Sequence, residues 1–160
     1  MVPLVFREAF DPRFPDFPVP RNQANVHFEP MRPSIPMQDT YFEGALVDSA
    51  AGYTVIPCKI HSSGLLKIHQ ELGTKPYQIL SEHGTPNLQR FAEVGIRFLI
   101  KQPDGNLGYW PEEFVKIKAY LLDEGAWPAG KVLLGLDTLL ENFITHLEKN
   151  NSFLKGRDAA

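Results

Sequence analysis

A stiff arginine loop is the first part of this sequence whose residues could do chemistry. Arg32 lies in the run MRPSIP, and Pro30 and Pro33 flank it. Because proline fixes φ, such a loop can hold a guanidinium ready for a phosphate or a carboxylate. Ser34 could bring a hydroxyl to the same anion. The competing interpretation is a solvated arginine in a proline-rich arm.

A second polar group follows in the segments KIHQEL and KPYQIL. Side chains alternate between the two faces of a strand, so Gln70 would lie on the face opposite to His69. A histidine and a tyrosine that line a cleft can stack on a flat ring and hydrogen-bond to its substituents. His69 and Tyr77 are therefore candidate ligand-binding residues.

The histidines and the single cysteine offer weaker sites. His61 and His69 are eight residues apart, and the sequence contains neither Cys-x-x-Cys nor His-x-x-x-His, so we predict no metal site. Cys58 and His61 could form a nucleophile and its base. The competing interpretation is that Cys58 is a small hydrophobe at the end of a strand.

Composition bounds the class of protein. The chain has 160 residues, of which 43% are hydrophobic, as expected of one globular domain. A net charge of −3 without a basic run argues against nucleic-acid binding, and no apolar stretch reaches the ~20 residues of a membrane span. The N-terminus lacks a signal-peptide core, and one cysteine excludes an internal disulfide. We therefore expect a cytoplasmic protein, exported only by a machine that needs no such signal.

The elements that position the candidate residues begin with a proline-rich segment. Residues 1–40 hold eight of the 14 prolines. Proline removes a backbone donor and fixes φ, so we predict an irregular arm over residues 11–37. One short strand is predicted before it, in PLVFREAF.

Residues 41–100 are predicted to form the sheet and one helix. ALVDSAAGYTVIP has the pattern of two strands around a small-residue turn, and KPYQIL is a strand by its composition. LLKIHQEL fits either a strand or a helical turn. From Asn87 onward, apolar residues recur at helical spacing, which predicts an amphipathic helix.

Residues 101–160 are predicted to form a turn and two helices. The turn is centred on Asp104 and Gly105. One helix begins at Pro111, and Asp137 caps the other. The apolar stripe of the last helix comprises Leu140, Phe143, Ile144 and Leu147. The whole chain is thus predicted to be a single α+β domain with a twisted, mainly antiparallel sheet and packed helices.

Three parts of the sequence together resemble one toxin family. They are LVFREAF with Arg7, the loop MRPSIPMQ, and the run from YTVIP through GLLKIHQELGTKPYQIL to NLQRFAEVGIRFL. The family is that of the second type VI secretion exported effector, including its fungal relatives. The resemblance covers about residues 4–99. It implies an ADP-ribosyltransferase-like fold and an intracellularly acting toxin that uses NAD in a cleft.

The resemblance also implies roles for individual residues. Arg7 would hold the nicotinamide–ribose side of NAD, and His69 and Tyr77 would face the cleft as catalytic residues. The cofactor-binding residues would be Arg32, Ser34 and Gln70. The reaction would transfer ADP-ribose or hydrolyse NAD, and an immunity protein would be the partner that covers the cleft.

A non-enzymatic interaction protein is the alternative function. The sequence lacks a clear Glu-x-Glu, the usual acid pair of ADP-ribosyltransferases, and it is mildly acidic. The two predicted C-terminal amphipathic helices could dock on a partner. An immunity protein, an adaptor or a secretion chaperone would have these properties.

Overall fold

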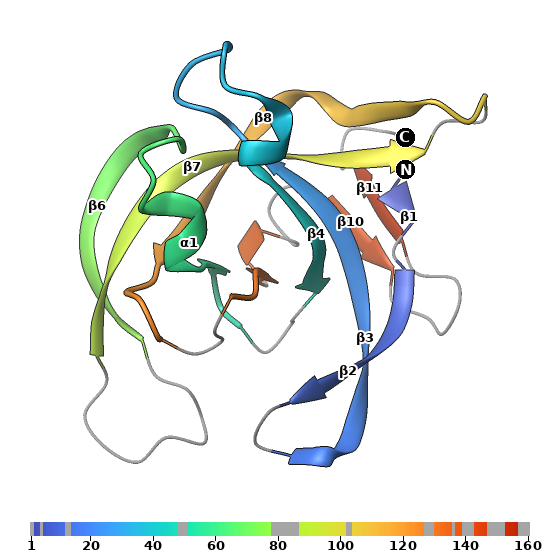
Figure 1. The fold of residues 1–160 in the computed structure, drawn as a ribbon, viewed down its shortest axis with the longest axis horizontal. Coiled ribbons are helices and arrows are strands. Elements are labelled where there is room, and N and C mark those ends of the chain that lie inside the picture. The colour runs from blue at the N-terminus through green and yellow to red at the C-terminus, as the bar shows by residue number, and fades with distance from the viewer. Residues whose placement is uncertain are drawn as a thin grey trace.

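The structure is a computed structural model whose described residues are mostly β-strand (Figure 1). They are residues 2–3, 5–11, 14–47, 51–77, 87–101, 104–126, 130–135, 137–138, 143–146 and 153–156. Side chains are described from Asn22 onward, apart from Lys101, Phe143–His146 and Gly156. The strands form two sheets.

The smaller sheet brings the two ends of the chain together. Its order is β1 (Val2–Pro3), β11 (Phe153–Gly156) and β10 (Phe143–His146), with both pairings antiparallel. Figure 1 shows this sheet beside the larger one, with both chain ends near it. Leu154 of β11 is fully buried and belongs to the main core, so the small sheet is packed onto the rest of the molecule.

The larger sheet closes into a barrel. Its eight strands, in spatial order, are β2 (Val5–Asp11), β3 (Phe14–Phe28), β4 (Tyr41–Val47), β9 (Leu133–Leu134), β5 (Thr54–Ile56), β8 (Leu107–Leu121), β7 (Asn87–Lys101) and β6 (Ile68–Tyr77). A further pairing between β3 and β7 closes six of them, from β3 through β9 to β7. β2 and β6 extend the sheet beyond β3 and β7.

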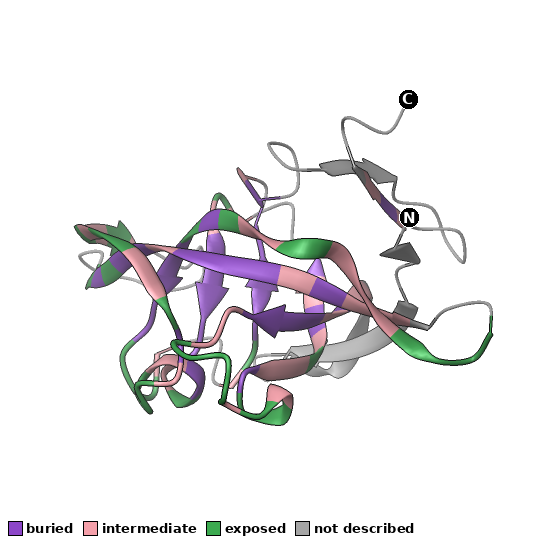
Figure 2. Cartoon of the chain, turned by 90° about the horizontal axis from the view of Figure 1, so that it is seen from above, coloured by how far each residue is buried: buried purple, intermediate pink, exposed green. Residues whose placement is uncertain are grey.

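Alternation along the strands produces the core. On β7, the fully buried side chains of the main core cluster are Ala92, Val94, Ile96 and Phe98. Inward and outward positions alternate along every strand of a barrel, so this set fills the interior. Figure 2 shows the described residues coloured by burial, with the buried ones concentrated on the strands of the barrel.

The predicted α+β fold is wrong, and the ADP-ribosyltransferase-like architecture with packed helices fails with it. The two longest predicted helices are strands β7 and β8. On β8, Phe114, Ile117 and Leu121 match a helical stripe, but Val115, Ile117 and Ala119 match strand alternation equally well. β7 pairs with β3, β6 and β8, and these pairings favour the strand over the helix.

The described helical segments are short. They are α1 (Cys58–His61), a 3-10 turn η1 (Met37–Asp39), and residues 137–138. The predicted last helix is wrong at residues 143–146, which form β10. None of the described helices combines the length and apolar character that spanning a membrane requires.

The prediction of an irregular arm over residues 11–37 is wrong in its first half. Most of that half belongs to β3, in which Pro18 and Pro20 lie. β4 pairs with β3 only from Gln23 onward, so the prolines lie where β3 has a single partner, β2. A strand tolerates proline where one side is unpaired.

Other local predictions are confirmed. Strands β4 and β5 lie on either side of the small-residue segment, and β2 covers residues 5–10 of the first predicted strand. The turn between β7 and β8 has Gly105 at φ 87°, which glycine adopts without strain. Its neighbour Asn106 donates its N–H to Asp104 Oδ1 over 2.9 Å.

Candidate functional site

The crossing of β9 between β4 and β5 is a tightly constrained part of the barrel. β9 is parallel to β4, with Val47 opposite Leu134. It is antiparallel to β5, with Val55 opposite Leu133. Parallel strands end at the same edge of a sheet, so the carboxyl ends of β4 and β9 lie together. The connection from β4 to β5 has to span β9 at that edge.

Buried hydroxyls tie this crossing together. The Oγ1 atoms of Thr54 and Thr138 are 2.6 Å apart, and both side chains are fully buried. The N–H of Gly135 donates to Thr54 Oγ1 over 3.1 Å. The N–H of Asp137 donates to the carbonyl oxygen of Gly52 over 2.9 Å. Satisfied buried polar groups rigidify their surroundings, so the chain after β9 fixes the start of β5.

Gly135 allows the two segments to approach closely. A Cβ at this position would clash with the carbonyl group of Tyr53. Backbone atoms cannot swing aside as the end of a long side chain can, so a side chain at position 135 would push β5 away from β9. The close crossing therefore requires glycine directly after β9.

The connection over β9 contains one carboxylic acid in its sequence. Asp48 follows Val47, the last residue of β4, and precedes Ser49 and Ala50. Asp48, Ser49 and Ala50 lie outside the described residues, whereas Val47 and Thr54 on either side are buried. A carboxyl group is one of the side chains that can act as a general acid or base.

An apolar cluster on the outer face of the barrel wall borders this crossing. Its buried members are Val55, Phe91, Tyr120, Leu122 and Leu133. Val55 is the register partner of both Tyr120 and Leu133. Phe91 is the partner of Tyr120, so these side chains form one row across four strands. Leu46 of β4 packs against the row, so the connection from β4 begins beside it.

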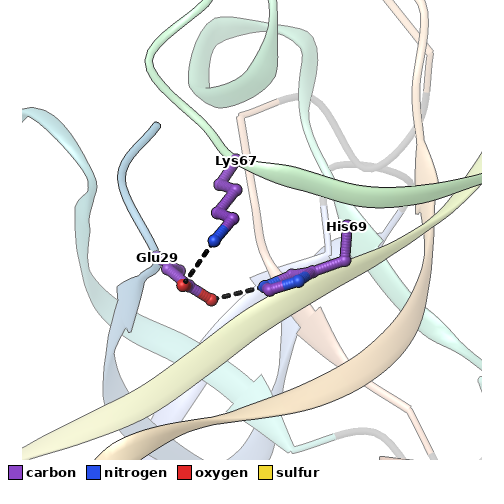
Figure 3. Close-up of polar contacts among 3 residues, drawn as sticks. All are labelled: Glu29, Lys67 and His69. Atoms are coloured by element: carbon purple, nitrogen blue, oxygen red, sulfur yellow. Dashed lines mark hydrogen bonds and ion pairs between the residues drawn. The ribbon is translucent and has the colours of Figure 1, made fainter. Parts of the chain in front are cut away.

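Glu29, Lys67 and His69 form a polar cluster that joins the end of β3 to the start of β6 (Figure 3). Glu29 Oε2 lies 2.5 Å from His69 Nε2, and Glu29 Oε1 lies 3.4 Å from Lys67 Nζ. The Lys67 N–H also donates to the Glu29 carbonyl over 3.0 Å. A Cβ at Gly95 would occupy the space of the Glu29 carboxylate. The cluster thus orients His69 and engages one of its ring nitrogens.

A buried histidine and an arginine form a third polar centre where β3 meets β7. Arg97 Nε donates to His27 Nδ1 over 3.1 Å, and His27 Nε2 lies 3.1 Å from Thr40 Oγ1. Burial, followed by the nearby Arg97 charge, lowers the pKa of His27 to about 4. The neutral ring therefore accepts from Arg97 and donates to Thr40. Arg97 also stacks on Tyr109 and Phe114.

The predicted anion-binding arginines lie on different elements. Arg7 is on β2, opposite Arg21 of β3, and its side chain is outside the described ones. Arg32 and Ser34 are exposed in the loop between β3 and η1. A hydrogen bond of 3.1 Å from the Ile35 N–H to the Arg32 carbonyl closes a turn in that loop. The phosphate role of this loop stays a prediction.

The predicted pair His69 and Tyr77 lies at the two ends of one strand. The start of β6 pairs with Val94 of β7, whereas Tyr77 pairs with Asn87. At the usual strand rise, this separation is about 20–25 Å. Gln70 is exposed next to His69. His69 and Gln70 are consecutive residues at the start of β6, and Tyr77 lies at its far end.

The weaker candidate sites have structural partners. His61 Nε2 lies 2.7 Å from the Leu122 carbonyl oxygen, which can only accept. The Nε2 atom of His61 therefore donates to this carbonyl, and burial lowers the pKa of the ring. Within the ranges described, no three His, Cys, Asp or Glu side chains are grouped to hold a metal ion.

Comparison with known proteins assigns no function to these sites. Searches of protein-family models, characterised proteins and solved structures returned no match to this chain. The β4–β9–β5 crossing is the candidate site, because its hydrogen-bonded framework is the most specific of those described above. The predictions from histidines and arginines did not include it. Its signal was an aspartate between two apolar strands in ALVDSAAGYTVIP.

Proposed function

We propose that this chain is one half of an aspartic peptidase in which Asp48 is the catalytic carboxyl. In such enzymes two aspartates share one proton. Each chain would supply one of them, so two copies related by a two-fold axis would form the site. The observation that carries the proposal is the tightly tied crossing of β4, β9 and β5, whose connection contains Asp48.

The crossing has the rigidity that such a site needs. Catalytic groups must be held close to their productive geometry by hydrogen bonds and packing behind them. Gly52 and Thr54 are held by bonds from the chain after β9. Asp48 is one peptide bond from Val47, which is buried in the core. Both ends of the short connection are therefore anchored.

The sheet formed by the chain ends supports pairing with a second copy. Among the described strands, β10 pairs only with β11, so no described strand pairs with its other edge. An open edge can add a strand from another chain. A two-fold pairing would use the same surface on both copies.

The two carboxyls would divide the proton transfers of peptide hydrolysis. The ionised Asp48 takes a proton from water, and the water oxygen bonds to the scissile carbonyl carbon. The protonated Asp48 of the second copy gives its proton to the carbonyl oxygen. When the tetrahedral intermediate collapses, the C–N bond breaks and the amine leaves with the proton that the first carboxyl took, while one hydroxyl of the intermediate returns its proton to the Asp48 carboxylate of the second copy and becomes the carbonyl oxygen of the acid. One water and one peptide yield one acid and one amine.

Cleavage of a peptide library, followed by mass spectrometry, tests the proposal. The wild-type protein should cut extended peptides, and Asp48→Asn should lower the rate by roughly 10²–10⁴-fold, the usual contribution of general acid–base catalysis. Asp39→Asn is the matched control, because Asp39 is an exposed carboxylate in η1. Full activity in Asp48→Asn would overturn the proposal.

A mixing experiment tests the shared site. Excess Asp48→Asn added to wild-type protein should lower the activity, because mixed dimers hold one carboxyl in place of two. Excess Asp39→Asn should leave it unchanged. Activity that stays constant in both mixtures would argue that one chain works alone.

The toxin that uses NAD, with its immunity partner, stays a prediction. Its support was the resemblance, and the barrel contradicts the fold that the resemblance implied. Growth of cells that express Arg32→Ala or His69→Ala, compared with wild type, tests toxicity. The non-enzymatic interaction protein also stays a prediction, and the open edge of β10 would suit such a partner.

A further inference from the structure

An aromatic corner on the outer face of the barrel holds a lysine ammonium. Lys75 Nζ of β6 lies 5.2 Å from the ring centre of Tyr53 and 5.5 Å from that of Phe91. Both distances are within the range of cation–π attraction. The two rings meet edge to face, with centres 4.9 Å apart and planes at 72°. They form two walls around the ammonium.

Two further tyrosines extend this corner. The ring centre of Tyr120 lies 5.3 Å from that of Phe91 and 6.1 Å from that of Tyr53. Tyr77 packs on Tyr120 at 5.1 Å. The Tyr120 hydroxyl donates to the Pro76 carbonyl over 2.8 Å, which fixes its ring. Phe91 and Tyr120 are buried, whereas Tyr53 and Tyr77 are half-buried, so the corner is preformed and reachable from solvent.

The strand register explains why Lys75 occupies the corner. Lys75 is the partner of Gln89 on β7, and Phe91 lies two residues farther on. Cross-strand partners and alternate residues share a face, so the three side chains lie on one side of the β6–β7 pair. No carboxylate of the described residues forms an ion pair with Lys75. Among the described residues, the groups that hold its ammonium are these two rings.

An acidic hollow borders the same corner. It is lined by Asn87, Leu88, Gln89, Asp123, Glu124, Gly125 and Ala126. Gln89 Oε1 accepts the Asp123 N–H over 2.9 Å, and Ala126 packs against the aromatic cluster. Asp123 and Glu124 are exposed. Two exposed carboxylates in this hollow make the region attractive to a cation from outside.

We propose that the aromatic corner and its acidic rim bind a lysine or arginine side chain of a peptide substrate, and that Lys75 occupies this site in the free protein. The inference rests on the proposed peptidase function, since Tyr53 lies five residues after Asp48. An incoming cation displaces Lys75, whose flexible stem moves to solvent. The rings and the carboxylates then give a preference for basic substrates.

Binding of two small probes tests the site. N-acetyl-lysine methylamide and its norleucine counterpart have similar shapes and differ in the ammonium. In an NMR titration, Lys75→Ala should bind the lysine probe about two- to fivefold more tightly than wild type, as expected of a partly exposed cation–π site. The norleucine probe should bind both proteins alike.

Matched variants control for general effects. Lys59 lies over the Phe42 ring, at 5.3 Å from its centre, on another part of the surface. Lys59→Ala should leave both affinities unchanged. Tyr53→Leu, added to Lys75→Ala, should remove the preference for lysine, and Lys75→Ser should reproduce the gain of Lys75→Ala.

The outcomes separate this inference from the peptidase proposal. Equal binding of the two probes by Lys75→Ala would overturn the cation site, whether or not the protein cuts peptides. Cleavage without a preference for basic residues near the cut would also count against it. Lysine-selective binding by a protein that cuts nothing would keep the cation site and overturn the peptidase proposal.

Discussion

Arg97 and Lys75 each rest on a pair of aromatic rings, and they are held in different ways. The Arg97 guanidinium lies 3.5 Å from the ring centre of Tyr109 and 4.2 Å from that of Phe114. Arg97 also donates to His27 Nδ1 and to the Glu112 carbonyl oxygen. Its position is thus set by directional hydrogen bonds as well as by the rings.

Lys75 has the rings without those hydrogen bonds. Its ammonium lies more than 5 Å from the ring centres of Tyr53 and Phe91. Hydrogen bonds to a charged group contribute more than a partly exposed cation–π contact. The comparison teaches that the Arg97 centre is a structural joint between β7 and its neighbours, whereas the Lys75 corner can exchange its occupant.

The largest expected effect is the pH dependence of the Arg97 centre. The pKa of His27 is about 4 in the folded protein and 6.5 in the unfolded chain. The unfolded chain therefore binds the proton first, so stability is complete above pH 6.5 and falls as the pH drops toward 4. The loss amounts to about 3 kcal/mol by pH 4. Urea unfolding at a series of pH values measures it.

A substitution by a residue that does not titrate separates the effect of His27 from the titration of the carboxylates. In His27→Gln, an amide oxygen can accept from Arg97 and an amide nitrogen can donate to Thr40. This variant should lose less stability than wild type between pH 6.5 and 4. If the free energy of unfolding fell equally with pH in the two proteins, His27 would not titrate as inferred.

Removal of the Arg97 charge should have the next largest effect. Arg97→Met keeps an apolar stem but leaves His27 Nδ1 and the Glu112 carbonyl without their donor, and an unsatisfied buried acceptor costs about 1–3 kcal/mol. Chemical denaturation at pH 7 should therefore show a loss of about 2 kcal/mol. A change below 0.5 kcal/mol, which is typical of surface substitutions, would contradict the structural role.

The smallest effect is expected at the Lys75 corner. Lys75→Met removes a partly exposed cation–π contact, so its free energy of unfolding should differ from wild type by about 0.5–1 kcal/mol at most. The same denaturation experiment measures it beside Arg97→Met. A loss as large as that of Arg97→Met would make both cations structural and remove the contrast between the two regions.

The sequence predicted local features better than long ones. The strands around ALVDSAAGYTVIP and the turn at Gly105 depend on nearby residues, and both were found as predicted. β7 and β8 were predicted as helices because their apolar residues fit both periods. Fifteen-residue strands depend on pairing with distant partners, which a window of sequence does not contain.

The candidate site was predicted only in part. His69 and Gln70 were found side by side near a polar cluster, but Glu29, the residue that binds His69, lies 40 positions away. Tyr77 shares a strand with His69, and the length of that strand keeps them apart. Asp48 was not singled out from the sequence, because the proposal for this residue depends on β9, which comes from a distant part of the chain.

The sequence by itself determined the small-residue segment that contains Asp48, the glycine turn between β7 and β8, and the alternating apolar residues that can fill a barrel. Tertiary structure decided that these segments are strands, that β9 lies between β4 and β5, and that Lys75 meets Tyr53 and Phe91. The reason is physical. Turn chemistry is a property of neighbouring residues, whereas barrel closure and side-chain contact depend on which strands pair across long separations.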